Sequence, residues 1–104
     1  MGLFGLFGKS TLQKVIDKLK ENNLGSQAHL LKNVRNPSLT DDKKRLECDM
    51  LKKTFNLKQP GANESLNRFK WAKDICAEHN YSEGMRFMQY YVEVYELYLK
   101  EYCD

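Results

Sequence analysis

Apolar residues recur at helical spacing in five successive segments of this chain, and no segment shows the alternation of a half-buried strand. Short connections containing Asn, Gly or Pro join the segments. Helices joined so closely pack as roughly antiparallel neighbours. We therefore predict an all-α fold, either a compact bundle of about five helices or stacked helical hairpins. A length of 104 residues fits one helical domain, expected over residues 10–104.

The first helix is predicted over residues 11–22 and is opened by a capping box of Ser10 and Gln13. Gly25 is expected to close it in a left-handed conformation, and Ser26 to cap a short second helix. Both boundaries follow from residue types that satisfy the free backbone groups at helix ends.

The third helix is expected to begin after Ser38 or Thr40. Its buried stripe is predicted to comprise Leu46, Met50, Leu51 and Phe55.

Pro60-Gly61 is the clearest break in the chain, and Asn63 is the expected cap of the fourth helix. A second capping box, of Asn80 and Glu83, predicts a last helix that runs to about residue 102.

Composition is that of a folded soluble protein, with 41% hydrophobic and 30% charged residues. The three cysteines are widely spaced, which is not typical of a disulfide framework. No apolar run approaches the roughly 18 residues that a membrane-spanning helix needs. We expect a cytoplasmic protein. The apolar, glycine-rich segment 1–9 is expected to dock on the helical body or to be flexible, rather than to bind a membrane.

Charge is divided unevenly along the chain. Residues 1–73 hold fifteen Lys and Arg against seven Asp and Glu, and residues 74–104 hold two against seven. The net charges are therefore +8 and −5. Such asymmetry indicates either a basic surface for nucleic acid or acidic protein, or two parts that attract each other within the fold.

The last predicted helix is rich in tyrosine, since five of the six tyrosines lie within residues 87–102. Arg86, Gln89, Glu93, Glu96 and Lys100 fall on one polar seam, and most other positions are apolar or aromatic. Each phenol hydroxyl needs a hydrogen-bond partner or water, so neighbouring tyrosines suit a boundary better than a dry core. The predicted protein-binding residues are Phe87, Tyr91, Glu93, Tyr95, Glu96, Tyr98 and Tyr102.

Two other uses of these rings are open at this point. The rings could cover neighbouring helices while their hydroxyls reach solvent. They could also stack on nucleic-acid bases, although the flanking glutamates would repel phosphate.

Residues 69–95, FKWAKDICAEHNYSEGMRFMQYYVEVY, resemble one helical hairpin of the tetratricopeptide type. Trp71-Ala72 matches the large and small positions of the first helix, Tyr81 lies in the turn, and Gly84 stands where the helices approach closely. Ile75 and Tyr91 depart from the family pattern, and a shift of 34 residues finds no second copy. The resemblance implies peptide or protein binding rather than catalysis.

The alternative function is nucleic-acid binding by the third helix and the residues that follow it. The residues concerned are Lys43, Lys44, Arg45, Lys52, Lys53 and Lys58. Several acidic residues lie three or four positions away, so a solvated face of paired charges is the other interpretation.

Cys76 and His79 lie three apart and raise the question of a metal site or a nucleophile with its base. The spacing alone is weak evidence, and no recognised catalytic motif accompanies it. We expect no enzymatic activity, no cofactor and no metal. The expected partner is another protein, with a second copy of this chain as one form of it.

Overall fold

The computed structural model describes residues 10–33 and 39–103, and all their regular structure is α-helical. The helices are α2 (Thr11–Glu21), α3 (Gly25–Asn33), α4 (Asp41–Phe55), α5 (Gln59–Glu78) and α6 (Ser82–Tyr102). The predicted all-α class with about five helices is confirmed for this part of the chain. The sequence predictions for residues 1–9 and for Ser38 lie outside the described residues.

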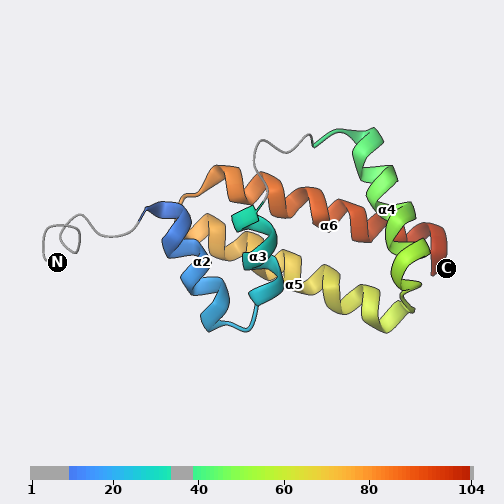
Figure 1. Ribbon diagram of the computed structural model, residues 1–104, viewed down its shortest axis with the longest axis horizontal. Coiled ribbons are helices and arrows are strands. Elements are labelled where there is room, and N and C mark those ends of the chain that lie inside the picture. The colour runs from blue at the N-terminus through green and yellow to red at the C-terminus, as the bar shows by residue number, and fades with distance from the viewer. Residues whose placement is uncertain (1–9, 34–38, 104) are drawn as a thin grey trace, which may run out of the picture.

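The two longest helices, α5 and α6, form an antiparallel hairpin that runs the length of the helical body (Figure 1). The α2–α3 pair packs mainly against α5 near one end of this hairpin, and α4 packs against α6 near the other. Gly84 marks the close approach at the turn of the hairpin. A Cβ atom placed there would lie 2.7 Å from the Cys76 sulfur and 2.6 Å from the Tyr81 ring.

Two helices begin as their capping residues predict. The Ser10 hydroxyl accepts a 3.1 Å hydrogen bond from the Gln13 backbone N–H, and Thr40 caps α4 in the same way at 3.2 Å. The reciprocal half of the first capping box is wrong, because the Gln13 side chain bonds Asp17 instead.

Three helices end at asparagines with positive φ, namely Asn23 after α2, Asn56 after α4 and Asn80 after α5. Asparagine tolerates this left-handed conformation better than most residues with a side chain. The prediction that Gly25 closes the first helix is therefore wrong: Asn23 takes that position, and Gly25 is the first residue of α3. Ser26 lies inside α3 rather than before it.

The starts of α5 and α6 also differ from the prediction. Helix α5 begins at Gln59, so Pro60 and Gly61 belong to its first turn and Asn63 does not cap it. Proline fits there because the first backbone N–H groups of a helix have no partner within the helix. Tyr81 precedes α6 without a side-chain cap, because Asn80 closes α5 instead of opening α6.

The buried side chains form two clusters along the α5–α6 hairpin. The larger gathers apolar residues of α2, α3, α5 and α6, including Val15, Leu19 and Met88. The smaller joins α4, α5 and α6 and contains Cys48, Ala62, Tyr90, Val94 and Tyr98. The clusters meet at partly buried side chains that pack against both.

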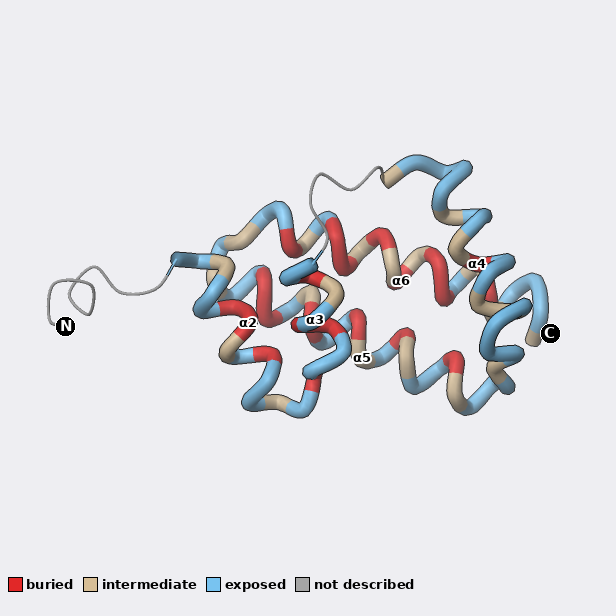
Figure 2. The backbone as a smooth tube through the Cα atoms, viewed as in Figure 1, coloured by how far each residue is buried: buried red, intermediate tan, exposed pale blue. Residues whose placement is uncertain are grey.

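The predicted buried stripe of α4 is wrong. Leu46, Met50 and Phe55 are 54%, 55% and 65% exposed, Leu51 is half-buried, and the buried residue of α4 is Cys48. Figure 2 shows α4 exposed along most of its surface. The thiol of Cys48 is small, so its side of the helix approaches Val94 and Tyr98 of α6. At about 100° per residue, Leu46 and Met50 then face away from α6.

Within the described residues, no helix has the length and apolar character needed to cross a membrane.

Candidate functional site

Most of the tyrosine-rich face of α6 is turned into the fold. Phe87, Tyr95 and Tyr98 are buried, and Tyr98 has no exposed surface at all. Tyr91 is half-buried and its ring stacks on Phe69 with 5.0 Å between the centroids. The central residues of the predicted protein-binding surface are therefore buried in this conformation, where their rings pack against neighbouring helices.

The two tyrosines at the end of α6 have their hydroxyls satisfied within the chain. The Tyr98 hydroxyl donates a 2.8 Å hydrogen bond to the Leu57 carbonyl oxygen. The Tyr102 hydroxyl donates one of the same length to an Asp49 carboxylate oxygen. Of these two tyrosines, Tyr98 is fully buried and Tyr102 is 38% exposed. These acceptors remove the reason for expecting an external partner at both positions.

The polar seam of α6 is organised by Glu93, which lies between two helices. One carboxylate oxygen accepts from the Lys44 ammonium of α4, and the other accepts from the Gln89 amide at 2.8 Å. The Gln89 carbonyl oxygen in turn accepts from Lys73 of α5 at 2.7 Å. The hydrogen bond and charge of Lys44 hold the pKa of Glu93 below its usual value. Glu96, further along the seam, is exposed.

The basic residues of α4 are divided between the fold and the solvent. Lys44 pairs with Glu93 and Asp41, and Arg45 pairs with Glu101 at 3.3 Å. The Lys52 ammonium lies 5.4 Å from the centre of the Tyr102 ring. The other three residues, Lys43, Lys53 and Lys58, are exposed and have no side-chain hydrogen bond or ion pair among the described residues. Half of the predicted nucleic-acid-binding residues thus contact α6. These contacts agree with an attraction between the basic and acidic parts of the chain within the fold.

The outer face of α4 is a line of four exposed residues, Asp42, Leu46, Met50 and Lys53. Each lies three or four positions from the next, so their side chains share one side of the helix. Two large apolar side chains one turn apart are bracketed by an acid at one end and a base at the other. Sequence reasoning missed this surface because it assigned Leu46 and Met50 to the core.

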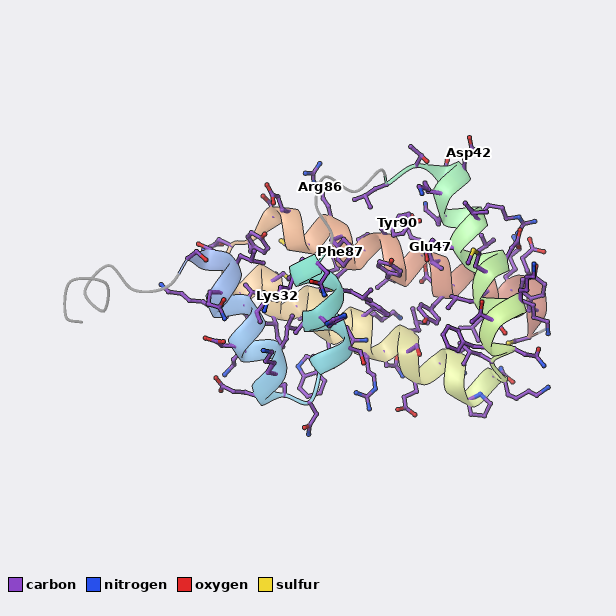
Figure 3. All side chains as sticks on the ribbon, viewed as in Figure 1. Lys32, Asp42, Glu47, Arg86, Phe87 and Tyr90 are labelled. Atoms are coloured by element: carbon purple, nitrogen blue, oxygen red, sulfur yellow. The ribbon has the colours of Figure 1, made fainter. Side chains whose placement is uncertain are left out.

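A cavity of about 460 Å³ opens between α4, α5 and α6. Its walls include Leu39, Lys44, Lys73, Met85, Arg86 and Tyr90. Figure 3 shows Arg86 projecting away from the body of α6. The Tyr90 residue is only 7% exposed, and burial together with the nearby Glu47 carboxylate raises its pKa to about 12. The phenol is therefore protonated at neutral pH and keeps its O–H as a donor.

A second groove, of about 640 Å³, lies between the α2–α3 turn and the first half of α5. Trp71 on its wall is 48% exposed. Arg68 is held across it by a 2.9 Å hydrogen bond to the Asn23 carbonyl oxygen and by an ion pair with Glu64. Its guanidinium is therefore already engaged within the chain.

Cys76 and His79 are not brought together as a reactive pair. Cys76 is fully buried, and burial raises the pKa of its thiol to about 11. The His79 Nδ1 atom lies 3.0 Å from the Ile75 carbonyl oxygen. Among the described residues, no three His, Cys, Asp or Glu side chains cluster as metal ligands would.

No protein-family model, no curated protein and no solved structure matches this chain.

Proposed function

We propose that this protein is a non-enzymatic protein-binding module, and that its contact element is the outer face of α4, which pairs with a second copy of the chain. The observation that carries the proposal is the exposure of Leu46 and Met50, each more than half accessible and adjacent on one helix face. A helix that presents apolar residues at i and i+4 is a common way for one protein to bind another.

The charge pattern supports a second copy as the partner. In an antiparallel arrangement of two α4 helices, Asp42 of one copy lies opposite Lys53 of the other. In the same register, Leu46 of one copy lies opposite Met50 of the other, to within one residue. Two-fold symmetry repeats both contacts, so one face supplies two ion pairs and a shared apolar centre.

The contact is short, and weak association is expected. A helix of 15 residues is about 22 Å long, so the buried area falls at the low end of the range for specific interfaces. Reversible pairing in the micromolar range or weaker is consistent with that size.

Exchange of the two charges provides the sharpest test. Asp42→Lys and Lys53→Asp should each weaken self-association, because each places like charges opposite one another in a homodimer. A mixture of the two variants should restore association, since both contacts then join Lys to Asp. Sedimentation equilibrium over a range of concentrations measures all three cases, and circular dichroism checks that each variant folds.

Lys70→Asp is the matched control, because it changes charge as Lys53→Asp does at an exposed position on α5. It should leave association unchanged. A wild-type chain that stays monomeric at about 1 mM, or variants whose mixture associates no better than each alone, would contradict the proposal.

Nucleic-acid binding is less well supported. Lys44, Arg45 and Lys52 are engaged with residues of α6, and the exposed Lys43 and Lys53 share α4 with four acidic residues. Retention on heparin that falls steeply with salt would favour this alternative over the α4 contact.

A further inference from the structure

We propose that the cavity between α4, α5 and α6 binds a small organic carboxylate with an apolar body. This site is separate from the outer face of α4, because Lys44, which lines the cavity, lies on the opposite side of that helix. The two proposals therefore stand or fail independently.

The polar groups of the cavity have more donors than acceptors. Its carboxylate, Glu93, already accepts from Lys44 with one oxygen and from Gln89 with the other. The Gln89 carbonyl oxygen is taken by Lys73. A ligand entering the cavity therefore meets few free acceptors among the lining side chains.

Several donors are still available to a ligand. Arg86 makes no hydrogen bond or ion pair with any other residue in the described ranges, so its whole guanidinium is available. The Tyr90 hydroxyl likewise has no partner in that part of the chain, although the residue is more than nine-tenths buried. Among the described residues, the buried side-chain polar atom without a partner is the Gln27 carbonyl oxygen, so the Tyr90 hydroxyl itself reaches the surface of the cavity and its O–H can donate to a ligand there.

Charge favours the same kind of ligand. Three cations and one carboxylate line the cavity, and Asp41 and Glu47 stand nearby. Lys44 pairs with Glu93, Lys73 donates to the neutral Gln89 amide, and Arg86 has no hydrogen-bond or ion-pair partner among the described residues. A guanidinium binds a carboxylate through two parallel hydrogen bonds, which favours a planar anion at this position.

The other residues that line the cavity indicate that the ligand also has an apolar part. Leu39, Met85 and the ring of Tyr90 offer apolar contacts beside the donors. A volume of about 460 Å³ lies within the range of small-molecule sites. Together these features fit an anion at one end of an aliphatic or aromatic body.

The test uses 4-phenylbutyrate as the probe and 4-phenylbutanol as its neutral counterpart, each titrated into the whole chain and followed by NMR. The butyrate should shift signals of the first half of α6 together with Lys44 and Lys73. The alcohol should bind more weakly by about tenfold or more, because it cannot form the pair of charge-assisted hydrogen bonds that the carboxylate makes with the guanidinium.

Variants then assign the donors. Arg86→Gln should weaken butyrate binding by about tenfold, and Tyr90→Phe, which keeps the ring, by a smaller factor. Lys70→Gln removes an exposed cation outside the cavity and should change affinity little. Equal binding of acid and alcohol, shifts centred elsewhere, no binding, or an unchanged affinity in Arg86→Gln would each overturn the proposal.

Discussion

The hydroxyl of Tyr98 donates a 2.8 Å hydrogen bond to the carbonyl oxygen of Leu57, although 41 residues separate the two in sequence. Leu57 lies in the connection between α4 and α5, and Tyr98 lies near the end of α6. The bond therefore joins the connection to the last helix at the centre of the smaller cluster. It also explains how a tyrosine without exposed surface keeps its hydroxyl satisfied.

Replacement of Tyr98 should separate the contribution of its ring from that of its hydroxyl. Tyr98→Ala leaves a cavity in the smaller cluster and should lower the free energy of unfolding by about 3 to 5 kcal/mol. Tyr98→Phe keeps the ring and should cost about 1 to 3 kcal/mol, because the Leu57 carbonyl loses its donor. Urea unfolding followed by circular dichroism gives both values. Equal losses for the two variants would contradict the assignment.

Gly84 should be intolerant of a methyl group. In Gly84→Ala the new Cβ would lie 2.6 Å from the Tyr81 ring and 2.7 Å from the Cys76 sulfur, so the α5–α6 turn has to shift. We expect a loss of about 1 to 3 kcal/mol in the free energy of unfolding. Gly61→Ala is the control, because its Cβ would meet only Leu57 at 3.8 Å. This variant should gain about 0.5 to 1 kcal/mol, since alanine favours a helix.

The helices could be predicted because their signals are local. Residues 11–22 and 80–102 show regular apolar spacing, and the observed α2 and α6 match these ranges to within two residues. The ends of the helices are harder to predict, because both Asn and Gly can adopt the positive φ that ends a helix. Asn23 and Gly25 stand two positions apart, and residue type alone does not say which adopts the left-handed conformation.

The orientation of α4 could not be predicted in the same way. Apolar residues occupy two sides of this helix, Leu46 and Met50 on one, Cys48 and Leu51 on the other. The choice between them depends on α6, whose Val94 and Tyr98 share a buried cluster with the small side chain of Cys48. This information lies in another part of the chain.

The environment of the α6 tyrosines could not be predicted for a related reason. The acceptors of Tyr98 and Tyr102 come from residues 41 and 53 positions away. Sequence reasoning correctly required a partner for each hydroxyl and placed that partner outside the chain. The polar seam of α6, by contrast, was predictable because the Gln89–Glu93 hydrogen bond is an i, i+4 contact.

The Lys44–Glu93 ion pair predicts a pH-dependent contribution to stability. The pKa of Glu93 is lowered in the folded state, so its contribution is present above the unfolded value near 4.5 and is lost as pH falls through the folded pKa. The pKa of Lys44 is raised, chiefly by its hydrogen bond to Glu93, so its contribution is lost at alkaline pH above 10.5.

Glu93→Gln should therefore destabilise the chain at about pH 7 and have less effect at about pH 3. Because the Glu93 side chain is 39% exposed, the difference should stay below about 1 kcal/mol. Glu96→Gln, an exposed neighbour on the same helix, is the control for general charge effects. Urea titrations of both variants at the two pH values measure the difference. An equal loss at both pH values would contradict an ionic contribution.

The three cysteines should differ in their reaction with iodoacetamide. Cys48 and Cys76 are buried, and burial raises the pKa of both thiols, that of Cys76 to about 11. Cys103, which follows the last residue of α6, is partly exposed. Since the thiolate is the reacting form, the folded chain at about pH 8 should take up one label quickly and the other two only after opening.

Mass spectrometry after short exposure, with and without urea, counts the labels. Cys103→Ser should abolish the fast label. A second fast label in the folded chain would show that a cluster around Cys48 or Cys76 opens readily.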